Sequence, residues 1–184
     1  METIATYVKE VYSSKDFVVT INELFGETPA KTEQVLDLSL ACLMVCLTKQ
    51  MTHPIGKTIA SNKILTANVP SLEAELLSDA AYLSHIALKG DQLLGGLLPS
   101  QKSSIVNLLV MHTKVRREPA SFLLGVLTYV LVSKLQAVVA KAHKIDELST
   151  FLNRQVVEWS APRLSFKDIE VLGASSLFVR PQYA

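Results

Sequence analysis

The chain has 184 residues, of which 49% are hydrophobic and 19% are charged, and its 18 basic and 17 acidic residues leave a formal net charge of +1. This length fits one domain, and the high apolar content excludes an intrinsically disordered chain. A net charge near zero gives no overall attraction to nucleic acid or to anionic lipid.

The amino terminus lacks the basic and apolar regions of a secretory signal, so we expect a cytoplasmic protein. The two most apolar runs, residues 35–47 and 122–132, are shorter than the ~20 residues that a helix needs to cross a bilayer. We therefore expect no membrane span and interpret both runs as parts of core helices.

The first two expected elements are short helices. Residues 3–12 carry apolar side chains at helical spacing (Ile4, Tyr7, Val8 and Val11). Residues 17–25 contain a β-branched run that suits a strand or a helix. We expect a helix there because no partner strand follows nearby.

Two helices, about residues 29–50 and 119–142, dominate the chain. Each begins at a proline, which is favoured at the first helical position, and each contains a stretch that is apolar on every side. Such a helix must be covered all round. The predicted fold is therefore an all-α, single-domain multihelical bundle built around these two buried helices, with residues 1–160 as the bundle domain.

Shorter helices should surround this pair. The sequence predicts one from Pro54 to about Leu65, one from Leu72 to about Gly90, one opened by Ser100, and a last one that ends before Pro162.

The C-terminal segment, residues 161–184, has no helical stripe but is too apolar for a free tail. We expect an irregular segment that docks either on its own bundle or on a neighbouring copy. As a docking segment it could mediate self-association through Phe166, Ile169, Val171, Leu177, Phe178 and Tyr183.

The loop expected at residues 112–117 is basic. With an upstream lysine it could form a surface for an anionic partner, made of Lys102, Lys114, Arg116 and Arg117. The helix after this loop is too apolar to read base edges, so nucleic acid is an improbable partner. The alternative is a solvated loop that neutralises nearby helix ends.

No residue pattern in the chain indicates a catalytic, cofactor or metal site. Cys42 and Cys46 lie on one helix face, but zinc needs four ligands and no histidine pattern completes the set. The four histidines are scattered, and the Gly95-Gly96 pair lacks the context of a phosphate-binding loop. We expect a protein that is not an enzyme and that needs no cofactor.

Three motifs from residues 93–127 resemble a bacterial family known as domain of unknown function 937. They are Leu93-Leu94-Gly95-Gly96-Leu97-Leu98, Lys102-Ser103-Ser104-Ile105-Val106 and Ser121-Phe122-Leu123-Leu124-Gly125-Val126-Leu127. The resemblance covers roughly residues 20–155. It implies an all-helical bacterial domain and brings no known activity, cofactor or catalytic residue.

These observations favour a non-enzymatic interaction or assembly module that forms a homo-oligomer or binds another protein. One alternative is binding of nucleic acid or another polyanion through residues 112–117. Another is carriage of an apolar ligand in a pocket between the two central helices, which the small residues Ala41, Cys42 and Gly125 would permit.

Overall fold

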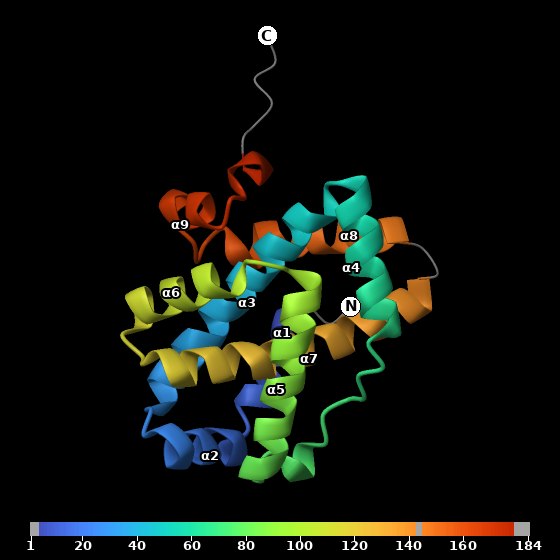
Figure 1. Ribbon diagram of the computed structural model, residues 1–184. Coiled ribbons are helices and arrows are strands. Elements are labelled where there is room, and N and C mark those ends of the chain that lie inside the picture. Colours follow the sequence, from blue (N-terminus) through green and yellow to red (C-terminus); the bar gives the residue numbers. More distant parts are fainter. Residues whose placement is uncertain (1–3, 143–144, 179–184) are drawn as a thin grey trace.

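The structure is a computed structural model that describes residues 4–142 and 145–178 of the chain. The described residues form helices and no strand (Figure 1). The α-helices are α1 Ile4–Tyr12, α2 Lys15–Phe25, α3 Pro29–Met51, α4 Pro54–Thr66, α5 Ala80–Leu97, α6 Lys102–Thr113, α7 Arg117–Ala142, α8 Ile145–Gln155 and α9 Phe166–Val171. This confirms the predicted all-α bundle, including the helix at residues 17–25.

Helices α3 and α7 form the centre of the bundle, as the sequence predicts. Residues 38–48 of α3 and 123–133 of α7 are buried without a break. Helix α7 packs against α3 and against α5, which crosses it steeply, while α1, α4, α6 and α8 pack around this centre (Figure 1). A helix that is apolar on every side must be covered all round. This is why most of the shorter helices pack against α3 or α7.

Both central helices are longer than the apolar runs within them. By length and composition alone, residues 29–51 and 117–140 could each cross a membrane. In the structure, 78% of the apolar window of α3 and 72% of that of α7 are buried by the protein itself. Such burial is typical of the core helices of a water-soluble bundle. The absence of a membrane span remains a prediction that this packing supports.

The prediction that a helix ends at Gly90 is wrong, because α5 continues through this residue to Leu97. Gly90 faces Gly125 of α7, and a Cβ atom at Gly90 would overlap the carbonyl oxygen of Gly125. A Cβ atom at Gly125 would in turn meet the backbone of Ala87. The two glycines therefore allow two helix backbones to approach closely, and neither of them ends a helix.

Several helix boundaries also differ from the sequence prediction. Helix α5 begins at Ala80, capped by the side chain of Asp79, and a 3₁₀ turn precedes it where the prediction began a helix at Leu72. Helix α6 begins at Lys102, two residues after Ser100, which has a φ of 71°. Helix α7 begins at Arg117. Boundaries depend on cap geometry, which the apolar pattern reports poorly.

The described part of the C-terminal segment, residues 161–178, docks on its own chain. It contains α9, which a capping box between Ser165 and Asp168 opens, and a 3₁₀ turn at Ser175–Leu177, so it is less irregular than expected. Its buried apolar side chains are Leu164, Ile169, Leu172 and Ala174. Just before it, the Ser160 hydroxyl donates a 3.0 Å hydrogen bond to the carbonyl oxygen of Ala41 in α3.

Candidate functional site

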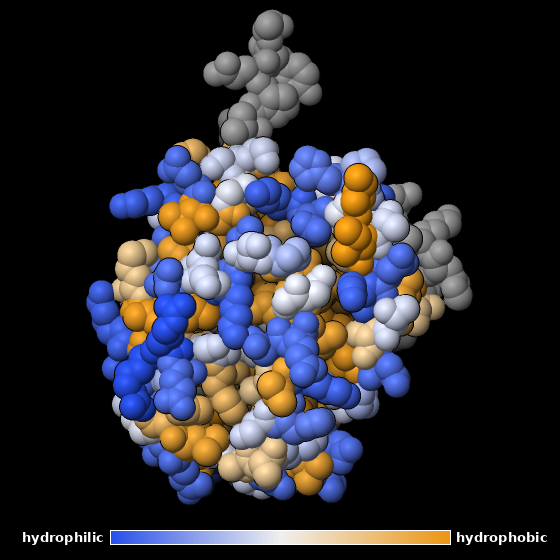
Figure 2. Space-filling view, in the orientation of Figure 1, coloured by the Kyte–Doolittle hydropathy of each residue, from blue (hydrophilic) through white to orange (hydrophobic). Residues whose placement is uncertain are grey.

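Helix α4 carries the most prominent exposed apolar surface on a single helix in the described part of the chain. Its inward face uses Gly56, Ala60 and Ile64, and the small residues let it pack closely on its neighbours. Its outward side chains include three large aliphatic residues: Ile55, Ile59 and Leu65. Ile55 is 77% exposed. Figure 2 shows a strip of apolar atoms over the upper part of this helix.

The segment of the chain that contains α4 has basic residues and no acidic ones. No aspartate or glutamate occurs between Asp37 and Glu73, whereas three lysines occur there: Lys49, Lys57 and Lys63. A hollow of about 210 Å³ lies between α4 and α5, lined by Lys63, Lys89 and Gln92 among others. Burial of aliphatic side chains stabilises association.

The sequence pattern predicted α4, but the outward apolar residues of this helix were not among the predicted site residues. A signal was available, because Ile55 and Ile59 are four residues apart on one side of the helix, while Ala60 and Ile64 are four apart on another. Two apolar stripes on a peripheral helix require two partners. Only the structure shows that one of the stripes is covered by the protein itself.

The structure does not bring the four predicted basic residues together. Lys102 and Lys114 lie at opposite ends of α6, roughly 18 Å apart at the rise of an α-helix. Lys102 forms a 2.5 Å ion pair with Asp91. The predicted loop at residues 112–117 is also shorter, because His112 belongs to α6 and Arg117 to α7.

The two arginines of this set serve intramolecular contacts. The Arg116 side chain donates a 2.6 Å hydrogen bond to the carbonyl oxygen of Phe25, near the end of α2, and lies 4.0 Å from the Glu27 carboxylate. The Arg117 side chain donates to the side-chain oxygen of Asn107 at 2.7 Å. The Arg116 contact at the end of α2 agrees with the alternative interpretation, a loop that neutralises nearby helix ends, whereas the Arg117 contact joins α7 to the middle of α6. Lys114 is exposed and has left-handed backbone geometry.

The predicted self-association residues of the C-terminal segment separate into two groups. Ile169 is buried against the chain's own bundle, and Leu177 and Phe178 are half-buried. Phe166 and Val171 remain exposed, at 65% and 50%. Tyr183 lies outside the described residues. Ile169, Leu177 and Phe178 are therefore wholly or partly packed within the chain, whereas Phe166 and Val171 are not.

A polar cluster fastens α9 to α6. A ring nitrogen of His112 lies 2.8 Å from one carboxylate oxygen of Asp168. The other oxygen accepts hydrogen bonds from the Ser165 amide and hydroxyl at 2.9 and 2.7 Å. Burial alone would raise the pKa of Asp168, but the hydrogen bonds from Ser165 and His112 outweigh this and hold the pKa below its usual value.

This cluster contains serine, histidine and aspartate without forming a catalytic triad. In a triad the histidine lies between the serine hydroxyl and the carboxylate. Here both Ser165 and His112 bond to Asp168, so the serine has no base to activate it. The arrangement joins α9 to α6, and no sequence pattern indicates it because His112 and Asp168 are 56 residues apart.

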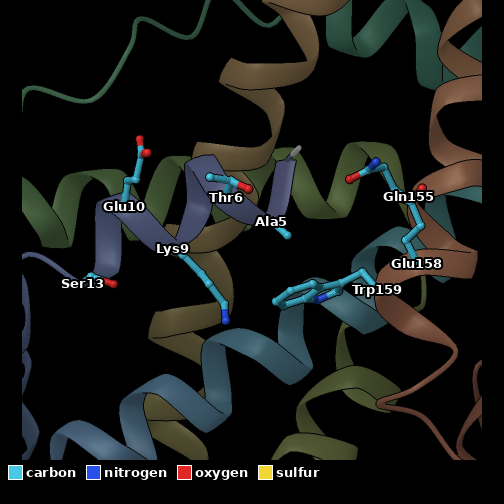
Figure 3. Close-up of a pocket in the computed structure, with 8 residues that line it drawn as sticks. All are labelled: Ala5, Thr6, Lys9, Glu10, Ser13, Gln155, Glu158 and Trp159. Carbon is cyan, nitrogen blue, oxygen red and sulfur yellow. The ribbon is translucent and has the colours of Figure 1, made fainter. Parts of the chain in front are cut away.

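A surface hollow of about 520 Å³ lies between α1 and the π-helical turn Val156–Ser160 that follows α8 (Figure 3). Trp159 contributes its ring to this hollow, and the Lys9 side chain extends toward it, with Nζ 5.2 Å from the ring centroid. The Arg163 guanidinium lies 3.4 Å from the same centroid. The Trp159 ring therefore makes cation–π contacts with both Lys9 and Arg163. Through Arg163 it helps to pack the C-terminal segment.

The small residues of the central helices are used for packing. Cys42 and Cys46 are buried, and burial raises the pKa of both thiols, that of Cys46 to about 12. Among the described residues, no group of three or more histidine, cysteine or acidic residues could hold a metal ion. Helix α5 fills the space beside Gly125. Gly125 is one of the three small residues predicted to leave room for a ligand pocket between α3 and α7, so that room is absent at this position.

The fold and these surfaces define the class of the molecule: a single-domain, all-α bundle with a C-terminal segment docked on its own core and an apolar outer helix face. Comparison with protein-family models, curated proteins and solved structures finds no match. The resemblance to the domain of unknown function 937 family therefore stays a prediction, as do the bacterial origin and the cytoplasmic location.

Proposed function

We propose that this protein is a non-enzymatic interaction module that self-associates through the outward face of α4. The observation that carries the proposal is the exposure of Ile55, Ile59 and Leu65 on one peripheral helix. Soluble proteins seldom expose neighbouring large aliphatic side chains without a partner. Removing such surface from water favours association.

The α4 face replaces the C-terminal segment as the proposed contact. Ile169 and Leu172 are buried in the chain's own core, so exchanging them between copies would add no newly buried surface. Ile55 and Ile59 can become buried only against another molecule. A second copy is always present at the protein's own concentration, which makes it the simplest partner.

The test is the molar mass in solution, measured by light scattering during size-exclusion chromatography over a range of concentrations. We expect the wild-type chain to form oligomers and a variant carrying Ile55→Glu and Ile59→Glu to be monomeric, because buried unpaired carboxylates oppose association.

The matched control is Val157→Glu, which places the same charge at another exposed aliphatic residue, 70% exposed in the π-helical turn. This variant should oligomerise as the wild type does. A wild-type chain that stays monomeric at every concentration would contradict the proposal.

A further inference from the structure

The hollow between α4 and α5 is a candidate binding site that the proposed self-association does not use. The two helices lie side by side there (Figure 1). The hollow has a volume of about 210 Å³, and its polar side chains are Lys63, Lys89 and Gln92. Sites for cofactors and drug-sized molecules occupy about 300–1,000 Å³, so this hollow suits a smaller ligand.

The charged side chains that line this hollow are both lysines. Among the described residues, no aspartate or glutamate lines it, and neither Lys63 nor Lys89 forms an ion pair. Asp91, the acidic residue closest to Lys89 in the sequence, pairs with Lys102 instead, at 2.5 Å. The Gln92 amide can add hydrogen-bond donors. Two cations and an amide around one small space favour an anion.

Gly96 of α5 positions one of the two lysines. A Cβ atom at Gly96 would lie 3.7 Å from both Cδ and Cε of Lys63 and 3.9 Å from its Nζ. The glycine therefore gives the lysine stem room to lie against α5. The nearby C-terminal end of α5 helps to hold this ammonium group. Lys89 is seven residues before Gly96, roughly 10 Å along the helix, so the same helix end does not account for it.

The wall of the hollow that follows α4 is fixed to α7. The amide of Val69 donates a 3.1 Å hydrogen bond to the side-chain oxygen of Gln136. The hydroxyl of Ser133 donates one of 3.4 Å to the carbonyl oxygen of Pro70. Since Val69 lines the hollow, these bonds set its shape before a ligand arrives. A preformed site loses less free energy in ordering its residues on binding.

We propose that this hollow binds the phosphate group of a small soluble molecule, held by Lys63, Lys89 and the side-chain amide of Gln92. A phosphate group carries about two negative charges near pH 7, which the two lysines neutralise, and its oxygens accept the hydrogen bond of the amide. A carboxylate carries one negative charge and would leave one lysine without a counter-charge. The apolar residues of the lining, Ala67, Val69 and Leu93, would contact the organic part of the ligand.

The test is a titration of the full chain with inorganic phosphate, in which sodium chloride keeps the ionic strength constant and NMR follows the side-chain amide of Gln92. We expect this resonance to shift until the site is saturated. A hollow variant carrying Lys63→Gln and Lys89→Gln should bind phosphate more weakly, by roughly tenfold or more for each lysine, because each loses a hydrogen bond between charged groups.

The matched control carries Lys15→Gln and Lys167→Gln, which remove the same charge from two exposed lysines outside the hollow. It should bind phosphate as the wild type does. All four substituted positions are exposed, so both variants should fold, which circular dichroism verifies.

Saturation in the wild type and the control, together with weaker binding by the hollow variant, supports the site. A wild-type chain that shows no saturable shift overturns it. Equal binding by the hollow variant and the control also overturns it, because the lysines of the hollow would then have no special part. A parallel titration with acetate tests the choice of phosphate, and equal affinity for both anions would overturn that choice. None of these outcomes depends on self-association, so the two proposals can fail separately.

Discussion

At the scale of single residues, Asp168 is the most informative side chain. Its carboxylate is nearly buried, with a side chain 5% exposed, and it accepts hydrogen bonds from two directions. A buried carboxylate is costly unless such bonds satisfy it. Asp168 therefore couples the capping box of α9 to His112 of α6, and it ties the C-terminal segment to the bundle.

Replacing this carboxylate should make the stability of the protein less dependent on pH. Because the pKa of Asp168 is lowered in the folded protein, its contribution is present above the unfolded-state pKa of about 3.9 and is lost as pH falls through the folded-state value. Asp168→Asn should lower the free energy of unfolding by about 1–3 kcal/mol at pH 7, and by less near pH 3. Urea denaturation at both pH values measures this.

Glu170→Gln is the control, because Glu170 is exposed on the same helix. It should change the free energy of unfolding by less than about 0.5 kcal/mol at either pH. An Asp168→Asn loss of the same size at both pH values would show that the charge of Asp168 has no part in holding α9.

At the scale of elements, the crossing of α5 over α7 shows why boundaries were harder to predict than the helices themselves. The apolar pattern predicted the ends of α3 and α7 to within two residues. A helix that is apolar all round is stable only when it is buried, so the pattern has one interpretation. Gly90 was interpreted as a helix end, since glycine is common there. The same residue type is required where two backbones approach, and no local pattern separates the two uses.

The crossing predicts opposite effects for two glycines of α5. Gly90→Ala should destabilise the protein by about 1–3 kcal/mol or more, because the Cβ atom of the alanine would overlap the backbone of Gly125. Gly95→Ala should stabilise it by about 0.5–1 kcal/mol, because a Cβ there meets nothing within 4 Å and alanine favours the helix. Thermal or urea denaturation of both variants gives the comparison. Equal effects would mean that α5 does not approach α7 as closely as described.

At the scale of the whole molecule, the predicted all-α bundle is confirmed. The sequence did not predict equally well which charged and apolar residues remain free on its surface. The basic residues were expected to act together, but Lys102 pairs with Asp91 and Arg116 reaches the carbonyl of Phe25, 91 residues away. The sequence shows which residues are charged, while long-range contacts decide which charges are already neutralised. The α4 face was missed for the same reason, because local spacing does not show which apolar stripe is covered.

Burial of α3 and α7 by the other helices predicts that the protein is soluble without detergent. The apolar windows of both helices are mostly covered, so no large core surface remains for lipid to solvate. The chain should purify in detergent-free buffer and stay in the supernatant after ultracentrifugation with uncharged lipid vesicles. A requirement for detergent, or recovery with the vesicles, would show that one or both helices enter a membrane instead.

The amino-acid sequence by itself determined the helical class and the identity of the two central helices, because side chains that are apolar on every side of a helix leave burial as the only stable arrangement. Only the tertiary structure decided that the C-terminal segment returns to its own bundle, that Gly90 marks a helix crossing, and that the apolar outer face of α4 is left uncovered. Each of these findings depends on which distant segment of the chain contacts a given residue. Contacts between residues that are tens of positions apart produce no periodic pattern in the sequence.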